Sequence, residues 1–296
     1  MPRSTIAPAL VIGATGRTGR GVVAELLRAG RTVRALVRNP EIARLPADVE
    51  LVTGDLTDPA SIARAAEGAQ SALLVWTAPF ETAPDVVAAL ARHVGRIVLL
   101  SSPHQTPHPF FQQPNPLAAF HAQLDRLVMD SAREWTIVRP GMFAANAIMW
   151  WARQIQAGDV VRWPYAAVET APIDERDIAA VVARALLEDG HAGRDYVITG
   201  PESLTHAEQV RAIGDAIGRR LVLHEITQDE FRAESGFPPP AANMLLAAWG
   251  ATVGVPAYVT TTVADVTGRP AHTFAEWAAA NVRSWSAAPR RSPTGS

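Results

Sequence analysis

The stretch Val11-Ile12-Gly13-Ala14-Thr15-Gly16-Arg17-Thr18-Gly19 decides the fold class of this chain. An apolar run from Ala9 leads directly into glycines spaced G-x-x-G-x-x-G, and apolar residues at helical spacing follow. A strand, a glycine turn and a helix in this order are typical of a dinucleotide site, because a turn without side chains lets backbone N–H groups approach a pyrophosphate. An ordinary tight turn is the alternative. The residues expected to hold the phosphates are Gly13, Thr15, Gly16, Arg17, Thr18 and Gly19.

Arg38 favours NADP(H) over NAD as the dinucleotide. It follows a second apolar run, Thr32 to Val37, about where a Rossmann fold meets the adenosine ribose. An acidic residue there would bind the 2′-OH of NAD, but the sequence from Ala35 to Asn39 contains none. A guanidinium group suits a 2′-phosphate, which it can hold through two parallel hydrogen bonds, and Arg17 offers a second positive charge. A solvated cation at the end of the strand is the alternative.

The composition is that of a globular protein with a sizeable core, since 48% of the 296 residues are hydrophobic and 19% are charged. A net charge of −2 argues against a nucleic-acid or membrane-surface role that depends on charge. The lack of cysteine excludes disulfides, thiolate catalysis and cysteine metal sites. No apolar run reaches the ~18 residues of a membrane span, and the first residues show no signal-peptide pattern, so we expect a cytoplasmic protein.

Apolar runs alternate with helical patterns through the first half of the chain. This alternation predicts a doubly wound, Rossmann-type α/β fold, with a parallel sheet covered by helices on both faces. Ligands of such sheets bind beyond the carboxyl ends of the strands, which favours residues 76–79, 101–102 and 140–143 as pocket candidates. The strands are expected near 9–13, 32–37, 50–53, 71–76, 97–101 and 136–139, and the helices near 18–29, 59–66, 82–93, 116–132 and 142–157.

After about residue 160 the pattern changes and predicts a smaller lobe. A helix over 174–187 and a strand over 196–199 are expected to return to the sheet. Helices over 205–217 and 228–235, a strand over 221–226, and helices over 241–249 and 274–285 are expected beyond it. We therefore expect a dinucleotide-binding domain over 1–160, joined by 174–199, a substrate-binding lobe over 200–286 and a disordered tail over 287–296.

Several motifs of the chain match one protein family. They are Gly13 to Gly19; Val33-Arg34-Ala35-Leu36-Val37-Arg38; Gly54-Asp55-Leu56-Thr57-Asp58; Ser101-Ser102; Trp135 to Phe143 with Asn146; and Thr267-Gly268-Arg269-Pro270. On these motifs the chain resembles the NmrA-like, atypical branch of the short-chain dehydrogenase/reductase family, whose members are NAD(P)-dependent reductases or non-catalytic cofactor sensors. The resemblance implies cofactor contacts by Asp55, Leu56, Trp76, Thr77, Ser101, Pro140 and Phe143.

The chain departs from this family at the catalytic helix. Standard members carry Tyr-x-x-x-Lys there, and the tyrosine donates the proton. When Asp125 is aligned with the acid usual in NmrA-like proteins, Leu117 stands at the tyrosine position and His121 at the lysine position. Leucine cannot transfer a proton, so the standard mechanism is unavailable unless another residue substitutes. The His-x-x-x-acid pattern resembles bacterial NAD(P)H:quinone oxidoreductases of the same branch.

His121 is the first catalytic candidate, because an imidazole with an ordinary pKa of about 6.5 can donate or accept a proton near neutrality. Asp125 lies one helical turn further on and can orient the imidazole, or can instead pair with Arg126, Arg139 or solvent. The alternative is a half-buried histidine that only packs.

Ser102 is the second catalytic candidate, since a hydroxyl at the end of the strand over 97–101 can hydrogen-bond a substrate carbonyl; capping of the following loop is the alternative. The loop over 103–116 contains five prolines and is expected to form a stiff wall or lid for an aromatic substrate. His104 and His108 lie on this proline-broken loop, so no metal site is expected. Substrate contacts are expected from Phe110, Phe111, Asn146 and Trp150.

Together these features predict an NADP(H)-dependent oxidoreductase that acts on a small apolar or conjugated carbonyl compound, quinone-like at the broadest, without the Tyr-x-x-x-Lys dyad. A non-catalytic NADP(H)-sensing regulator, or a repurposed cyclase or isomerase of the same fold, are the alternatives. The expected partner is a small-molecule substrate, with no nucleic acid and no membrane. The aromatic patch around Trp150 and Trp151 lines either the substrate pocket, the core or a homodimer interface.

Overall fold

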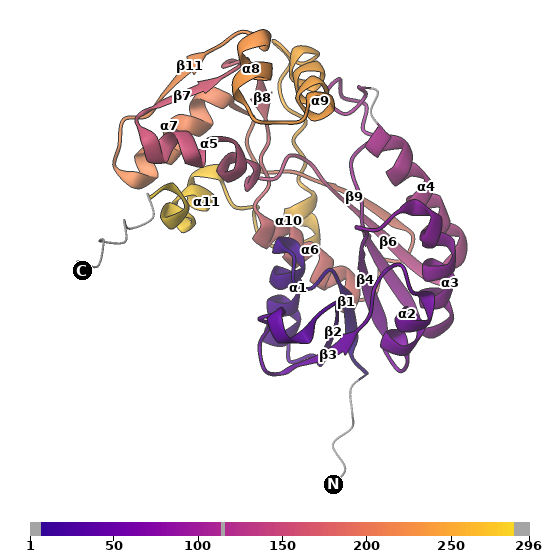
Figure 1. The fold of residues 1–296 in the computed structure, drawn as a ribbon. Coiled ribbons are helices and arrows are strands. Elements are labelled where there is room, and N and C mark those ends of the chain that lie inside the picture. The colour runs from indigo at the N-terminus through magenta and orange to yellow at the C-terminus, as the bar shows by residue number, and fades with distance from the viewer. Residues whose placement is uncertain (1–6, 114–115, 287–296) are drawn as a thin grey trace, which may run out of the picture. The chain divides into compact units, whose positions relative to one another are not determined.

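The computed structural model describes residues 7–113 and 116–286 (Figure 1). Contacts between residues divide the chain into two units. The first contains the residues up to Gly141 together with Glu175–Thr199 and Thr260–Ala271, and the second contains Met142–Asp174, Gly200–Val259 and the residues from His272 onward. The tail expected over 287–296 lies outside the described residues, as do residues 114 and 115 of the proline-rich loop.

A seven-stranded sheet forms the centre of the first unit, with the strand order β3-β2-β1-β4-β5-β6-β9. Every neighbouring pair is parallel; Ala9 of β1, for example, is in register with Val33 of β2 and with Ser71 of β4. The order reverses between β1 and β4, which places a ligand-binding crevice at their carboxyl ends. The strands are β1 (Ala9–Ile12), β2 (Val33–Val37), β3 (Val49–Thr53), β4 (Ser71–Val75), β5 (Arg96–Leu100), β6 (Glu134–Pro140) and β9 (Arg194–Ile198).

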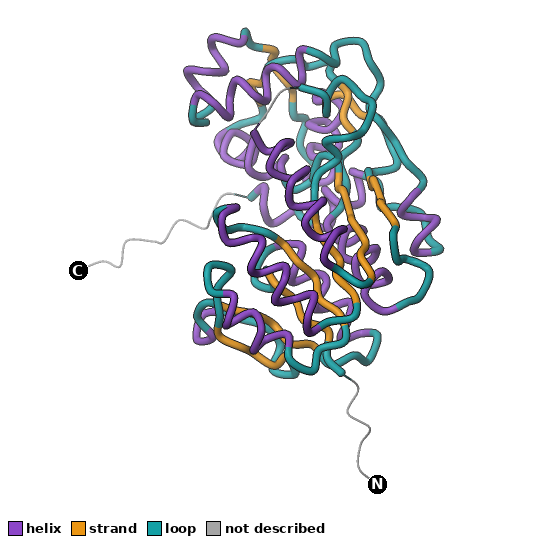
Figure 2. The backbone as a smooth tube through the Cα atoms, turned by 90° about the vertical axis from the view of Figure 1, so that its right-hand side faces the viewer, coloured by secondary structure: helices purple, strands orange, loops and turns teal. Residues whose placement is uncertain are grey.

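Helices cover both faces of this sheet, as Figures 1 and 2 show. On one face α1 (Arg17–Arg28) packs against α6 (Glu175–Leu187), and α10 (Thr262–Thr267) packs against α6. On the other, α2 (Pro59–Ala66), α3 (Ala83–His93) and α4 (Pro116–Ser131) pack in succession. Short 3-10 turns lie at η1 (Pro40–Ile42) and η2 (Phe80–Thr82). Because both faces are covered, Leu73, Leu74 and Ile97 in the central strands are fully buried.

The second unit has an aromatic core. Trp150, Trp151, Trp163, Trp249 and Phe231 form one group of rings with centroids 5.0–5.9 Å apart. Threonine and glutamate form complete capping boxes at the starts of three helices, α7, α8 and α11. The elements are α5 (Asn146–Ala157), β7 (Val160–Trp163), β8 (Glu169–Thr170), β10 (Leu204–Thr205), α7 (His206–Ile217), β11 (Val222–Glu225), α8 (Gln228–Glu234), α9 (Pro239–Gly250), α11 (Phe274–Ala280) and η3 (Val282–Trp285).

The predicted Rossmann-type fold is confirmed, and the strands of the large sheet lie where they were expected. The helix expected over 142–157 begins only at Asn146, because the preceding residues turn and the Ala144 N–H donates to the Ile173 carbonyl. The helix expected over 274–285 ends at Ala280 and continues as η3. Strands β7, β8 and β10 and helix α10 were not expected. Within the described residues no helix is long and apolar enough to cross a membrane.

The division into units differs from the expected domain boundaries at two places. Residues 142–160 group with the second unit, because α5 packs against β7 and η3. Residues 260–271 group with the first, because α10 packs against α6 and β9. The assignment of a cofactor role to one unit and a substrate role to the other stays a prediction.

Candidate functional site

Two glycines of the turn between β1 and α1 are required by the fold itself. Gly13 has a φ of +88°, which side chains rarely adopt, and its carbonyl accepts a hydrogen bond of 3.0 Å from the Gly16 N–H. A Cβ atom on Gly19 would lie 2.1 Å from the Gly13 carbonyl oxygen, so only glycine lets the helix approach the turn after β1 this closely. Both positions would need glycine even in a protein without a ligand.

Gly16 is required less strictly by the fold than Gly13 and Gly19. Its backbone is in the extended region that any residue adopts, and a Cβ atom there would meet only the Gly13 oxygen, at 3.2 Å. Residues 15–17 are exposed, and no side chain caps the start of α1. An uncapped helix start beside an exposed glycine fits the close approach of a pyrophosphate. The turn therefore fits a dinucleotide cofactor.

Arg38 follows β2 and is exposed. Within the described residues it has neither a hydrogen bond nor an ion pair, whereas Arg17 lies 3.7 Å from the carboxylate of Glu175. Asp55, after β3, accepts hydrogen bonds from the hydroxyl and the N–H of Thr57 at 2.7 and 2.8 Å. These bonds lower the pKa of Asp55, with a smaller contribution from the charge of Arg38. The structure thus places Arg38 and Asp55 close together at the carboxyl ends of neighbouring strands.

Arg20 joins the glycine turn to the segment that follows Arg38. Its Nε donates to the Thr15 carbonyl at 2.9 Å, and its two terminal nitrogens donate to the carbonyls of Arg44 and Ala43 at 2.7 and 3.0 Å. Arg44 has a φ of +48°, which is unusual for a residue with a side chain. The sequence carries no signal for these contacts of Arg20, because its partners are backbone carbonyls and two of them lie more than 20 residues away.

The residues expected along the cofactor from β3 and β4 differ in their environment. Leu56 is buried, and Thr77 is exposed. The Trp76 side chain belongs to the core cluster under α2, α3 and α4, and its indole N–H donates to the Ala78 carbonyl at 2.6 Å. The expected cofactor contact of Trp76 stays a prediction, as do the other contacts.

A buried charge network lies at the ends of β5 and β6. Asp125 of α4 and Arg139 of β6 are each 1% exposed, and Nη1 of Arg139 donates to Oδ2 of Asp125 at 2.6 Å. The other side of the Arg139 guanidinium donates to both carboxylate oxygens of Asp195 in β9, at 2.6 and 2.9 Å. Burial works against the charge of Arg139, but the two carboxylates outweigh it and raise the pKa of Arg139. Of the partners expected for Asp125, the structure selects Arg139.

Ser101 and His121 lie together beside this network. The Ser101 hydroxyl donates to Oδ1 of Asp125 at 2.6 Å, and its oxygen lies 3.4 Å from Nδ1 of His121. His121 is half-buried, and burial is the main cause that lowers its pKa; the nearby charges of His104 and Arg139 act in the same direction, and that of Asp125 opposes them. Asp125 therefore reaches the His121 ring through the Ser101 hydroxyl. Leu117, at the tyrosine position, is 56% exposed.

Ser102 and the proline-rich loop are tied to the same network. The Ser102 carbonyl accepts a hydrogen bond of 2.9 Å from Arg139, and the Ser102 hydroxyl lies 3.4 Å from Nδ1 of His104. The Nε2 atom of His104 is buried, and it lies 3.6 Å from Oδ2 of Asp125. His104 therefore lies against the buried carboxylate at the start of the loop, a position that its sequence context did not reveal.

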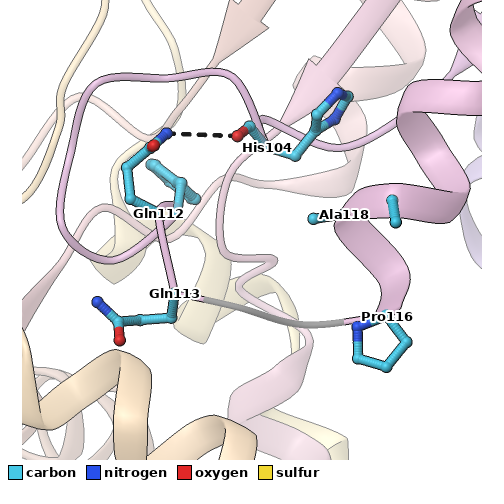
Figure 3. A pocket seen from close by; sticks show the side chains of 7 residues that line it. His104, Gln112, Gln113, Pro116 and Ala118 are labelled. Atoms are coloured by element: carbon cyan, nitrogen blue, oxygen red, sulfur yellow. Dashed lines mark hydrogen bonds between the residues drawn. The ribbon is translucent and has the colours of Figure 1, made fainter.

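A pocket of about 550 Å³ opens beside this loop (Figure 3). The side-chain amide of Gln112 points to the His104 carbonyl, 3.4 Å away. Phe111 lines the pocket and lies 4.0 Å from where a Cβ atom on Gly141 would be, so it approaches the end of β6. Phe110 packs edge-on against Phe111, with ring centroids 5.1 Å apart, and does not line the pocket. The lining residues are His104, Phe111, Gln112, Gln113, Pro116, Ala118 and Ala119.

The remaining expected site residues lie at the end of β6 and in the second unit. Pro140 is buried at the end of β6, whereas Phe143, Asn146 and Trp150 belong to the second unit. The Asn146 amide donates to the sulfur of Met142 at 2.9 Å. Trp150 is stacked on Trp163 and lines a pocket of about 460 Å³ within the second unit. Their contacts with ligands stay predictions. The described residues contain no group of histidines and carboxylates that could hold a metal ion.

The glycine turn, the parallel sheet and the exposed Arg38 define a dinucleotide-binding protein of the Rossmann type. The chain belongs to the NAD(P)H-binding family, which it matches over residues 13–189. The resemblance is thereby confirmed at the level of this family, and the chain shares the fold of NmrA, with a TM-score of 0.74 at 18% identity.

Relatives of known activity align with nearly the whole chain. A (4-alkanoyl-5-oxo-2,5-dihydrofuran-3-yl)methyl phosphate reductase from Streptomyces griseus is 36% identical, over 91% of this chain and 96% of the relative. An NAD(P)H azoreductase from Xenophilus azovorans is 34% identical, over 94% and 99%. The NADPH-dependent quinone oxidoreductase from Escherichia coli, solved with NADPH, shares the fold with a TM-score of 0.78 at 23% identity, over 92% and 99%. At this coarse level the prediction of an NAD(P)H-dependent oxidoreductase is confirmed.

Proposed function

We propose that this protein is an NADPH-dependent reductase of small conjugated carbonyl or quinone-like compounds that works without a tyrosine acid. The observation that carries the cofactor part is Gly16, an exposed glycine in the ordinary extended region, which faces away from the fold apart from one carbonyl at the uncapped start of α1. The preference for NADPH is supported by Arg38, which makes no hydrogen bond or ion pair in the described part of the chain and can bind a 2′-phosphate.

The substrate class is supported by the chemistry that the relatives share. The Streptomyces relative reduces a furanone whose ring double bond is conjugated with carbonyl groups, and the other two act on azo compounds and quinones, as their names state. Such acceptors give a fairly stable anion on reduction, so a strong general acid is dispensable. This agrees with the exposed Leu117 at the tyrosine position, because leucine has no ionisable proton to donate.

Different residues of the chain bind the cofactor and the substrate. The backbone of the glycine turn binds the pyrophosphate, and Arg38 binds the 2′-phosphate. The bound nicotinamide supplies a hydride. Because the Ser101 proton is held by Asp125, Ser102 is the hydroxyl of this pair that can hydrogen-bond a substrate carbonyl. Phe111 offers an aromatic face beside the end of β6.

A small-molecule substrate, no nucleic-acid partner, a homodimer and a cytoplasmic location complete the proposal, and they rest on the sequence. The alternative of a non-catalytic NADP(H) sensor is motivated by the missing tyrosine.

The test is NADPH consumption with p-benzoquinone, an azo dye and a simple saturated ketone as acceptors. We expect turnover with the first two and none with the ketone, because only the conjugated acceptors stabilise the negative charge. The Gly16→Val variant is the control, which must lose activity with every acceptor. Tight NADPH binding without turnover on any acceptor would favour the sensor.

A further inference from the structure

The hydroxyl of Ser101 has three polar neighbours, and only one of them can take its proton. Oδ1 of Asp125 lies 2.6 Å away, Nη1 of Arg139 lies 3.3 Å away and Nδ1 of His121 lies 3.4 Å away. A guanidinium group has no acceptor atom, and a carboxylate at 2.6 Å is a far stronger acceptor than an imidazole at 3.4 Å. The Ser101 proton therefore points to Asp125.

This assignment fixes which nitrogen of His121 is protonated. With its own proton on Asp125, the Ser101 oxygen can only accept from the histidine, so Nδ1 of His121 must be the donor. The two hydrogens of Nη1 on Arg139 have closer acceptors than Ser101, namely Oδ2 of Asp125 at 2.6 Å and the Ser102 carbonyl at 2.9 Å. The Ser101 oxygen is thus open to the Nδ1–H group of His121.

We propose that Ser101, positioned by Asp125 and Arg139, holds the neutral His121 ring in its Nδ1–H tautomer, so that Nε2 presents an acceptor to a hydroxyl group of a bound ligand. This deepens the proposed function and rests on it for the identity of the ligand. Nε2 has no hydrogen bond within the described residues and is not among the enclosed nitrogens without a partner. It is therefore within reach of a ligand.

The groups around His121 keep the ring neutral. The charged and titratable groups that face it are Asp125 from its own helix, His104 from the loop after β5 and Arg139 from β6. Burial lowers the pKa of His121, and the positive neighbours add to this effect. A neutral Nδ1–H ring accepts a hydrogen bond at Nε2 and cannot give a proton there. The structure therefore assigns His121 to binding a hydroxyl rather than to protonating a carbonyl.

Two ligands can supply the hydroxyl: the ribose of the dinucleotide and the hydroquinone formed from a quinone. Both present an O–H group that donates to a neutral imidazole nitrogen. A carbonyl oxygen has no proton to donate, and it cannot form a hydrogen bond with Nε2 because both atoms are acceptors. The unreduced quinone therefore gains nothing from His121, whereas its reduced product does.

The tautomer is measured directly by long-range ¹H–¹⁵N correlation spectra of protein labelled at histidine, above the pH range in which the ring is protonated. The His121 signals are identified by their loss in His121→Gln. We expect wild-type protein to show a protonated Nδ1 and an unprotonated Nε2 at His121. Ser101→Ala should shift the ring towards the Nε2–H tautomer, whereas Ser102→Ala should leave the tautomer unchanged. A protonated Nε2 in the wild type would overturn the proposal, and so would an unchanged tautomer in folded Ser101→Ala.

A second experiment identifies the ligand hydroxyl. It compares His121→Gln, whose amide oxygen can still accept a hydrogen bond, with His121→Leu, whose side chain cannot. If the hydroxyl is that of the ribose, His121→Leu weakens NADPH binding about tenfold and His121→Gln recovers part of it. If it is that of the product, NADPH binding is unchanged and inhibition by hydroquinone weakens by a similar factor. A folded His121→Leu variant with both affinities unchanged contradicts the proposal. Because neither the spectra nor NADPH binding needs turnover, a failure of the proposed reaction leaves this test intact.

Discussion

The arginines around the glycine turn differ in what they bind within the protein. Arg17 lies 3.7 Å from Glu175, and Arg20 donates to three backbone carbonyls. Arg38 has no such partner in the described residues, although it lies near Asp55. A cation that makes no hydrogen bond or ion pair within the protein can bind a phosphate without first breaking such a contact. The single residue that should decide between NADPH and NADH is therefore Arg38.

Arg38→Ala should weaken NADPH binding by ~1.5–3 kcal/mol, the usual contribution of a hydrogen bond to a charged group, and should barely change NADH binding. That loss corresponds to roughly a 10- to 150-fold rise in Kd. Fluorescence titration with both cofactors measures it. Arg133→Ala is a suitable control, because it removes the same charge from an exposed position before β6. Equal losses for NADPH and NADH would show that the 2′-phosphate is bound elsewhere.

At the scale of elements, the strand–turn–helix unit contains two kinds of glycine that the sequence alone does not distinguish. Gly19 lies in a close contact between the helix and the turn after β1, whereas Gly16 faces open space apart from one carbonyl. A side chain at Gly19 must therefore push the helix from the turn, and a side chain at Gly16 would mainly fill the space in which we propose that the phosphates bind. The two positions allow stability and binding to be separated within one turn.

Gly16→Val should lower NADPH affinity by at least ~100-fold while the melting temperature stays close to that of the wild type, because only the approach of the pyrophosphate is blocked. Gly19→Ala should instead lower the stability by ~1–3 kcal/mol or more, the usual cost of forcing an atom into a packed contact. Thermal unfolding and NADPH titration on both variants check the pair. A folded Gly16→Val protein that binds NADPH normally would refute the assignment of the site.

Arg20 connects the glycine turn, which we propose binds the pyrophosphate, to the segment after Arg38, which we propose binds the 2′-phosphate. Replacing it with alanine removes three hydrogen bonds from the Thr15, Ala43 and Arg44 carbonyls. We expect Arg20→Ala to weaken NADPH binding by ~5–20-fold through loss of this pre-ordered geometry, with NADH affected in the same proportion. An equal loss of NADPH and NADH affinity would indicate that Arg20 positions the backbone, whereas Arg38→Ala should weaken NADPH binding alone. Selective loss of NADPH would show that Arg20 binds the phosphate itself.

Elements with strong local signals were predictable from the sequence. Alternating apolar runs and helical patterns gave the strands and helices of the large sheet to within a few residues. Strands β8 and β10, with two residues each, and the six-residue helix α10 carry too little pattern to be seen, and their existence depends on partners far along the chain. The start of α5 was misplaced for the same reason, since the hydrogen bond between Ala144 and Ile173 crosses a long stretch of sequence.

At the scale of the whole molecule, the site was predictable only where it is local in sequence. The glycine turn and Arg38 follow from short motifs, and the i,i+4 spacing suggested that His121 and Asp125 interact. The structure shows that Ser101 mediates this interaction and that Asp125 is neutralised by Arg139, which also binds Asp195. These residues come from four separate segments, so their arrangement is a property of the sheet and not of any motif.

The stability of the molecule should also depend on one histidine outside the candidate site. His206 is fully buried in the aromatic core of the second unit, with ring centroids 5.1 Å from Trp249 and 6.1 Å from Trp151. Burial lowers its pKa to about 4, because a charged ring would lie among apolar groups. Nδ1 lies 3.0 Å from the Tyr165 carbonyl, and Nε2 is buried without a partner. A proton on Nε2 would therefore be poorly accommodated in the folded state.

The resulting prediction is acid destabilisation between pH 6.5 and about 4. In this window the unfolded chain binds a proton at His206 that the folded protein does not, so the free energy of unfolding falls as the pH is lowered, by about 3 kcal/mol in total. His206→Gln, which stays neutral, should flatten this pH dependence even if it is less stable at pH 7. His93→Gln, at an exposed position of α3, should leave the dependence unchanged. Urea unfolding followed by tryptophan fluorescence at several pH values measures the slope, since Trp151 and Trp249 surround the ring. An equal slope in wild type and His206→Gln would mean that other groups cause the acid sensitivity.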